Sequence, residues 1–329
     1  MPSVKVWAFM PKPTRALIIY NPTAGHARRA WPVVCNGLNA AGLLYDAHET
    51  HGPGEATERT RQALRDGYET IAAAGGDGTL GETATGFFDL NELDKNGLPT
   101  PINANAVFAP LPAGTGNDFT RALTNGKPAT LEKWLAALVS RRPGRMLDTL
   151  YGTTDGGAQR FIALNLVSLG ISVEVIERVR AQHGVLQKMP GGARFAIAAL
   201  SALRDWRERG VRVTLDNEPP REFTTNLLTF ANSPYAGGGM MFAPDAKLDD
   251  GYLDALLSGG LSRAEILREL PRIRSGGHVA NPKVTLAQAR FARVEMLNDE
   301  PFTVEADSNL RGATPLELRV MPQALRVLV

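Results

Sequence analysis

The chain has 329 residues, and its 36 basic side chains nearly balance 34 acidic ones. This balance, without a long run of Lys and Arg, argues against a nucleic-acid partner. Cys35 is the only cysteine, which excludes an intramolecular disulfide and a cysteine-based zinc site and fits a reducing cytoplasm. No apolar run reaches the ~18 residues of a membrane-spanning helix, and residues 1–13 do not resemble a secretory signal. We therefore expect a cytoplasmic protein without a transmembrane segment.

Strand and helix patterns alternate in the first half of the chain. We expect strands at 16–20, 44–47, 70–74 and 107–111, and helices at 27–41 and 54–65. Loops rich in glycine follow three of these strands, and helical patterns resume after the loops. Repeated units of strand, loop and helix are typical of a parallel sheet with helices on both faces.

Alternating apolar and polar residues dominate the second half, which is the pattern of antiparallel strands. We expect strands at 211–215, 223–231, 252–257, 291–296 and 316–320, and helices at 172–182, 193–209 and 262–273. Ser262 and Glu265 have the spacing of a helix capping box. The change of pattern predicts a domain boundary near Leu147.

The loop from Gly75 to Thr79 is the most informative segment, because glycines fill three of its first four positions. Backbone amides in such a loop can approach phosphate oxygens closely. The loop also opens a helix, whose N-terminus favours anions. Asp77 would repel a phosphate unless Mg²⁺ lay between the two groups. The loop therefore suits a metal-bound nucleotide, although a tight turn between strand and helix would explain it alone.

Two further loops favour the nucleotide site over the simple turn. Asn21 to Gly25 follows the first strand, and Gly114 to Asp118 follows the strand at 107–111. Loops at the carboxyl ends of parallel strands line one crevice, so together they favour a nucleotide site. Their glycine spacing matches neither the P-loop nor the Rossmann fingerprint.

These three loops, in their order and spacing, resemble the catalytic-domain motifs of the diacylglycerol, sphingosine and ceramide kinase superfamily, in its bacterial soluble branch. Gly237–Met240, Ala243–Ala246 and Leu248–Asp254 continue the resemblance, which runs from residue 15 to the C-terminus. It implies an ATP-dependent lipid kinase with ATP in a cleft between two domains. The implied fold is an α/β domain of the NAD kinase and phosphofructokinase type at 14–146, an antiparallel β-sandwich at 147–321, and a strand at 322–329 that returns to the first domain.

The resemblance also implies the residues that contact ATP, with Asp77 serving the Mg²⁺-bound phosphates and Thr50 as a more distant match. The full set is Asn21, Pro22, Thr23, Ala24, Gly25, Thr50, Gly75, Gly76, Asp77, Gly78, Thr79, Leu80, Gly81, Gly114, Thr115 and Asn117.

A second Mg²⁺ is implied in the segment from Lys247 to Tyr252. The Asp250 carboxylate and the backbone carbonyls of Lys247 and Tyr252 would be its ligands, which are the hard oxygen donors that this ion prefers. The Asp250-Gly251 pair is also typical of a hairpin turn, and the turn could present the ligands.

The lipid hydroxyl needs a base, and a carboxylate is the family's group for this task. The family's Asp-Gly-Glu motif falls on Asp307, Ser308 and Asn309, so we expect Asp307 to be the base and Asp77 the second catalytic acid. Asn309 replaces an acid and cannot accept a proton near neutral pH, and Gly81 stands where the family commonly has Asn. A nucleotide-binding regulator with impaired turnover therefore remains an alternative. An NAD kinase-like enzyme is another, because the Gly-Gly-Asp-Gly loop of NAD kinases is related.

The implied partner is a lipid at the inner membrane surface, either diacylglycerol-like or sphingoid, and the sequence does not distinguish them. A homodimer is compatible with the sequence. Asn165 is expected to be buried near the cleft, and His26 and His183 receive no chemical role. Three segments pair cations with apolar groups that suit a membrane interface, although solvated loops would look the same. They are Trp7–Met10, Arg141–Arg145 and His183–Phe195.

Overall fold

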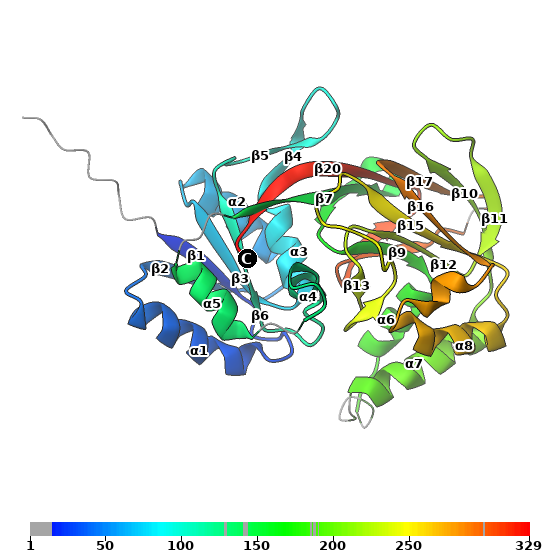
Figure 1. Cartoon of the computed structure of the whole chain (residues 1–329), viewed down its shortest axis with the longest axis horizontal. Coiled ribbons are helices and arrows are strands. Elements are labelled where there is room, and N and C mark those ends of the chain that lie inside the picture. The colour runs from blue at the N-terminus through cyan, green and yellow to red at the C-terminus, as the bar shows by residue number, and fades with distance from the viewer. Residues whose placement is uncertain are drawn as a thin grey trace, which may run out of the picture.

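The computed structural model describes residues 15–127, 130–140, 144–184, 186, 189, 191–298 and 300–329, and its two halves lie side by side in Figure 1. Of the expected membrane-contact segments, Trp7–Met10 lies outside the described residues. So do 141–143 of the segment Arg141–Arg145, and 185, 187, 188 and 190 of the segment His183–Phe195.

A parallel sheet lies at the centre of the first half, as the sequence predicts. Strands β1 (Ala16–Tyr20), β2 (Tyr45–Glu49), β3 (Thr70–Gly75) and β6 (Val107–Pro112) pair in the order β2-β1-β3-β6. The helices of this half are α1 (Ala27–Ala40), α2 (Glu55–Arg65), α3 (Asp77–Thr85), α4 (Asp118–Leu123) and α5 (Leu131–Val139).

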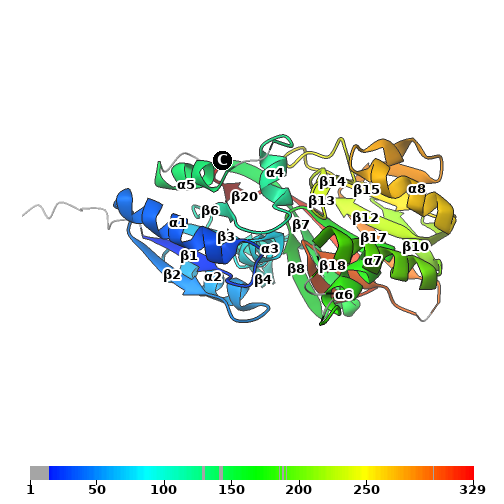
Figure 2. The same cartoon turned by 90° about the horizontal axis from the view of Figure 1, so that it is seen from below.

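Alternate residues of β1 face two different cores. Ile18 packs in one cluster with Leu38 of α1 and Leu135 of α5, whereas Ile19 packs in another with Leu64 of α2. All five residues of β1 are buried, as expected for a central strand of a parallel sheet. Helices therefore cover both faces, which the two views confirm (Figures 1 and 2).

The second half is an antiparallel β-sandwich. One layer contains β7 (Arg145–Thr154), β8 (Gln159–Ala163), β10 (Arg209–Leu215), β11 (Arg221–Thr225), β17 (Phe291–Met296) and β20 (Leu316–Val327). The other layer contains β16 (Val284–Ala289), β15 (Leu253–Ser258), β12 (Leu227–Ala231), β9 (Leu166–Gly170), β18 (Thr303–Ala306) and β19 (Asn309–Ala313), in that spatial order. Leu150 and Val213 of the first layer share one buried core with Val167 and Leu228 of the second.

Three helices lie beneath this sandwich in Figure 1, namely α6 (Ile171–Arg180), α7 (Gly191–Asp205) and α8 (Arg263–Ile273). Ser262 and Glu265 form the expected capping box of α8. None of the helices in the described part of the chain is long and apolar enough to cross a bilayer. The remaining elements are β4 (Phe88–Leu93), β5 (Pro99–Pro101), β13 (Tyr235–Ala236), β14 (Met240–Met241), η1 (Asp155–Gly157) and η3 (Gly277–Ala280).

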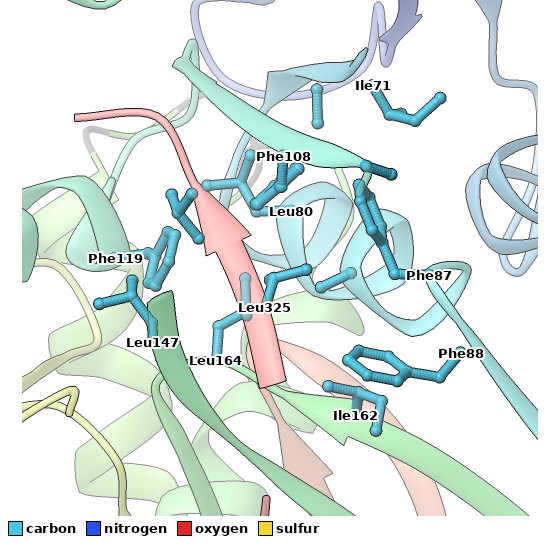
Figure 3. Packing of buried hydrophobic residues seen from close by; sticks show 14 of the residues in the cluster. Ile71, Leu80, Phe87, Phe88, Phe108, Phe119, Leu147, Ile162, Leu164 and Leu325 are labelled. Atoms are coloured by element: carbon cyan, nitrogen blue, oxygen red, sulfur yellow. The ribbon is translucent and has the colours of Figure 1, made fainter. Parts of the chain in front are cut away.

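Strand β20 connects the two halves. It pairs antiparallel with β17 and β7, and at Val327 it pairs in parallel with Phe108 of β6, so one sheet runs through both halves. Figure 3 shows that Leu325 of β20 and Ile162 of β8 lie in the same buried cluster as Phe108. The apolar core therefore crosses from one half to the other, and the predicted limits at residues 146 and 321 stay predictions.

Two expected elements of the second half are wrong. The single strand predicted at 223–231 breaks at Asn226 into β11 and β12, which belong to different layers. Asn226 donates its N–H to Ser258 and accepts the N–H of Ile171, so it is fixed between the two strands. The helix predicted at 193–209 ends at Asp205. Trp206 leaves the helix and stacks on Phe302, with ring centroids 6.0 Å apart.

Candidate active site

The glycine loops that follow β1, β3 and β6 contact one another at the carboxyl ends of the strands. Asn21 donates through its side-chain amide to the Thr79 hydroxyl at 3.0 Å. A Cβ atom at Gly114 would lie 2.4 Å from the Cα of Gly76, and one at Gly25 would lie 2.5 Å from the Thr115 hydroxyl. Residues larger than glycine would therefore force these loops apart.

The expected nucleotide residues differ in how they reach this crevice. Pro22 to Gly25 line a surface hollow of about 560 Å³ together with His26, Arg28 and Arg29.

Other expected residues support the loops. Asn117, at φ 55°, stabilises its loop by accepting the Gly114 N–H at 2.9 Å. Thr50 is buried and donates its N–H to Tyr20 at 2.8 Å, so it supports the end of β1. The Leu80 side chain is in the core, which leaves only its backbone for a ligand.

Asp77 connects two of the loops. It is the first residue of α3, and its carboxylate accepts the N–H groups of Asp118 at 3.1 Å and Phe119 at 3.0 Å. The Asn165 amide, from the second half, approaches the same carboxylate at 3.4 Å. Asn165 is buried, as expected, and it also accepts a hydrogen bond from the Ser233 hydroxyl at 2.9 Å.

Asp118 is a second buried carboxylate, which the sequence placed in a motif without assigning it a role. It accepts the N–H groups of Gly238 at 2.8 Å and Gly239 at 2.7 Å, from the loop between β13 and β14. Both glycines have positive φ, a conformation that turns their amides toward the carboxylate. Burial, with the nearby Asp77 charge, raises the pKa of Asp118 to about 6.

Asp307 occupies the turn between β18 and β19 and is 6% exposed. Its carboxylate accepts three backbone N–H groups, from Leu164 at 2.6 Å, Asn165 at 2.9 Å and Leu166 at 3.3 Å. Burial outweighs these bonds and, with the Asp77 charge, raises the pKa of Asp307 to about 6. The structure thus brings both expected catalytic acids to one place.

The two departures from the family pattern both contact this region. A Cβ atom at Gly81 would lie 3.0 Å from Oδ2 of Asp307, so glycine leaves room for that carboxylate. The Asn309 side-chain amide donates to the Gly78 carbonyl at 2.9 Å and connects the β18–β19 turn with the nucleotide loop. A carboxylate at position 309 could not donate this hydrogen bond.

Glu305 is a further acid that the sequence did not single out. It lies two residues before Asp307 on β18, is 5% exposed, and accepts a hydrogen bond from the Ser168 hydroxyl at 2.8 Å. Burial raises the pKa of Glu305 to about 7. The alternation of side chains along β18 places Glu305 on one face of the sheet. The sequence does not show that other elements cover this face, so it did not predict that Glu305 is buried.

An apolar cavity of about 340 Å³ extends from these acids between the six-stranded layer and the helices α6, α7 and α8. Its lining includes Asp77, Asp118 and Asp307. Its walls are mainly aliphatic and aromatic side chains, among them Ile171, Val175, Phe195, Leu203, Leu256 and Ile266. The site therefore joins a polar crevice to an apolar chamber, which is the arrangement that an amphipathic ligand requires.

The segment expected to hold a second metal has its own acidic surroundings. Asp250 accepts the Tyr252 N–H at 3.1 Å, and Gly251 donates its N–H to Asp148 at 2.6 Å. Burial and the Asp250 charge raise the pKa of Asp254 to about 6, and one of its carboxylate oxygens is buried without a hydrogen-bond partner among the described residues. The turn at 250–251 joins no two paired strands, so the hairpin interpretation is wrong.

Comparison with known proteins matches both halves of the chain to families. Residues 15–147 match the family described as "Diacylglycerol kinase catalytic domain", and residues 165–329 match "YegS C-terminal NAD kinase beta sandwich-like domain". The "Diacylglycerol kinase" of Staphylococcus carnosus is 28% identical over 316 residues, which cover 95% of this chain and 94% of that protein. A protein named "Probable lipid kinase YegS-like" from Xanthomonas oryzae pv. oryzae is 30% identical over 292 residues, which cover 88% of each.

A solved structure agrees with these matches. The crystal structure of a diacylglycerol kinase from Bacillus anthracis superposes with a TM-score of 0.64 and covers 96% of both chains at 20% identity, a level that demonstrates a shared fold. The α/β domain, the β-sandwich and the family matches agree with one another. The chain belongs to the diacylglycerol kinase and YegS-like lipid kinase family, a family of phosphotransferases.

Proposed function

We propose that this lipid kinase transfers the γ-phosphate of ATP, with Mg²⁺, to the hydroxyl group of a diacylglycerol-like lipid. The observation that carries the proposal is the apolar cavity whose lining includes Asp77, Asp118 and Asp307. A cavity lined mainly by aliphatic side chains suits acyl chains and disfavours a second nucleotide such as NAD, so it favours a lipid kinase over the NAD kinase alternative.

The three glycine loops would bind the phosphates of ATP. Their backbone amides lie at the carboxyl ends of parallel strands, and the loops lead into α1, α3 and α4. Free amides at helix N-termini favour anions. The expected residues Asn21 to Gly25, Gly75 to Gly81, Gly114, Thr115 and Asn117 would form the phosphate side of the cleft, with Thr50 behind β1.

The acidic part of the cavity lining fits a divalent cation. Burial and the Asp77 charge raise the pKa of both Asp118 and Asp307, so negative charge is concentrated around Asp77. No three His, Cys, Asp or Glu side chains of the described residues form a metal cluster by themselves. Asp77 and Asp118 would therefore share Mg²⁺ with water and phosphate oxygens, as this ion commonly does. Bound there, Mg²⁺ would neutralise charge on the phosphates.

The segment from Lys247 to Tyr252 would hold a second, structural Mg²⁺. The unpartnered carboxylate oxygen of Asp254 and the charge of Asp250 leave an excess of negative charge beside this segment. Asp250 and the carbonyl oxygens of Lys247 and Tyr252 are suitable ligands. This ion would stabilise the loop that precedes β15 and take no part in phosphate transfer.

Asp307 would act as the general base. In the proposed step, the lipid hydroxyl oxygen forms a bond to the γ-phosphorus, the bond from that phosphorus to the bridging oxygen breaks, and ADP leaves. The hydroxyl proton passes to the Asp307 carboxylate. The pKa of Asp307 is about 6, so the group is charged at neutral pH and is still basic enough to share a proton.

Membrane contact would occur at helix α7. Leu200 is 58% exposed and Phe195 is 37% exposed on this helix, while Leu203 of the same helix lines the cavity. An exposed apolar helix face beside an apolar cavity suits transfer of a lipid from a bilayer surface. Sedimentation with phosphatidylglycerol vesicles tests this contact, and a protein that stays in the supernatant at low salt would contradict it.

The decisive experiment for the proposed function is transfer of ³²P from γ-labelled ATP with Mg²⁺. Diacylglycerol, monoacylglycerol, sphingosine and ceramide are offered in mixed micelles, and NAD serves as a soluble acceptor. We expect label on diacylglycerol and none in the variant Asp307→Asn. Label on NAD would support the NAD kinase alternative. ATP binding by equilibrium dialysis without any labelled lipid would support a regulator and reject the proposal.

A further inference from the structure

The turn that carries Asp307 lacks the residue that its backbone favours. Ala306 pairs with Asn309, so Asp307 and Ser308 form a hairpin loop of two residues. Their φ angles are 47° and 66°, the left-handed values of a type I′ turn. Glycine is strongly preferred at the second position of this turn, because side chains make the left-handed conformation unfavourable. This chain has Ser308 there.

Glu305 holds the second residue of this turn. Its carboxylate accepts the N–H of Ser308 through one oxygen and the Ser168 hydroxyl, at 2.8 Å, through the other. Arg180 of α6 donates to the Ser308 carbonyl. The backbone N–H and carbonyl groups of Ser308 are thus both bound by side chains, one from β18 and one from α6.

The buried Glu305 carboxylate is expected to lower the stability of the fold. Glu305 is 5% exposed and lies on β18 directly opposite Ser168 of β9. Burial of a charge is unfavourable without good partners, and its partners here are a hydroxyl and a single backbone N–H. Sandwich stability alone would be served better by an apolar residue at this position.

We propose that Glu305 is a positioning residue for Asp307. By holding the Ser308 N–H, it keeps the turn in the left-handed conformation that glycine would adopt unaided. The Asp307 side chain is fixed by the N–H groups of Leu164, Asn165 and Leu166, and Glu305 fixes the backbone from which that side chain departs. The inference rests on the proposed role of Asp307 as the base.

A mutant cycle of Glu305→Ala and Ser308→Gly tests the inference. We expect Glu305→Ala to lower kcat roughly tenfold while the KM for ATP changes little, because the nucleotide loops are untouched. Ser308→Gly removes the need for the contact, so adding Glu305→Ala to it should lower kcat less than about threefold. Equal losses in both backgrounds would overturn the inference. Glu317→Ala, an acid on β20 paired with Arg293, is the control.

Glu305→Gln keeps the side-chain volume and removes the charge, so it covers the case in which the alanine variant folds poorly. Its side-chain oxygen can still accept the Ser308 N–H. We expect kcat within about threefold of the wild type at pH 8. The inference is contradicted if Glu305→Gln lowers kcat as much as Glu305→Ala does and if Ser308→Gly does not reduce these losses. Glu305 would then have a role other than positioning.

Hydrogen exchange separates this inference from the proposed function. The peptide covering 303–313 should exchange faster in Glu305→Ala than in the wild type, and Ser308→Gly should reduce that difference. This readout needs no lipid substrate. If the wild type labels no lipid, the proposed function fails, and the exchange data still decide the role of Glu305. Unchanged exchange in Glu305→Ala would reject that role in either case.

Discussion

At the scale of single residues, the protonation of Asp307 should control the reaction. The charged groups around it are Asp77 of α3, Glu305 of β18 and Arg311 of β19. Burial raises the pKa of Asp307 to about 6. A base must lose its proton before it can accept another, so kcat should fall as the pH decreases through about 6 and stay level above that value.

Burial raises the pKa of Glu305 to about 7, but a protonated carboxyl keeps an oxygen that accepts the Ser308 N–H, so its titration should change kcat little. In Glu305→Gln the decline should likewise follow Asp307 alone. Asp307→Asn should lower kcat by ~10²–10⁴, the usual contribution of a general base, with ATP binding retained. Pre-steady-state rates between pH 5 and 8 provide the measurement. A flat profile in the wild type would exclude Asp307 as the base.

The sequence predicted which residues belong to the candidate site, but it did not predict the contacts that some of them make. Glycine loops and the motif register predicted Asp77 and Asp307, because spacing in the chain is what a motif records. The effect of Asn309 was not predictable, since the amide's use depends on the Gly78 carbonyl 231 positions away. Glu305 was missed for a related reason: its significance comes from burial and from the φ angle of Ser308, and neither is visible in residue types.

At the scale of secondary-structure elements, α7 forms part of the wall of the apolar cavity. Ala199 lines the cavity, and Ala196 of the same helix faces solvent. Ala199→Phe should occupy space that an acyl chain needs, and thus reduce transfer to long-chain diacylglycerol more than to a short-chain analogue. Ala196→Phe adds the same atoms outside the cavity and should not reduce transfer.

The ratio of kcat/KM for dioleoyl and dihexanoyl substrates measures this effect. We expect Ala199→Phe to lower that ratio several-fold, in line with the ~0.8 kcal/mol that each buried CH₂ contributes. Melting temperatures of both variants show whether the larger side chain also strains the fold. Equal ratios in the two variants would show that the acyl chain lies elsewhere.

Elements were predictable where a local pattern determined them. The strand at Ala16–Tyr20 and the capped helix from Arg263 to Ile273 agree with the sequence, because periodicity and capping are local. The break at Asn226 was not predictable, because it depends on contacts with Ile171 and Ser258 in distant segments. The segment from 223 to 231 has the pattern of one strand, but its two ends pair in different layers of the sandwich.

At the scale of the whole molecule, the two halves should unfold together. Leu325 of β20 is 1% exposed and shares its core with Phe108 of the first half and Ile162 of the second. Figure 3 shows these side chains gathered around β20. A perturbation there removes contacts from both halves, so it should weaken both by the same amount.

Leu325→Ala should therefore lower the free energy of unfolding by roughly 2–5 kcal/mol, the usual cost of truncating a buried leucine. Hydrogen exchange in increasing urea should show β1 and β3 of the first half losing protection at the same midpoint as β12 and β15 of the second. Leu297→Ala, at a position 45% exposed, is the matched control and should change stability by less than about 0.5 kcal/mol. If the first half kept its midpoint while the second half shifted, the halves would be independent units, and the continuous sheet would be a contact between domains rather than a shared core.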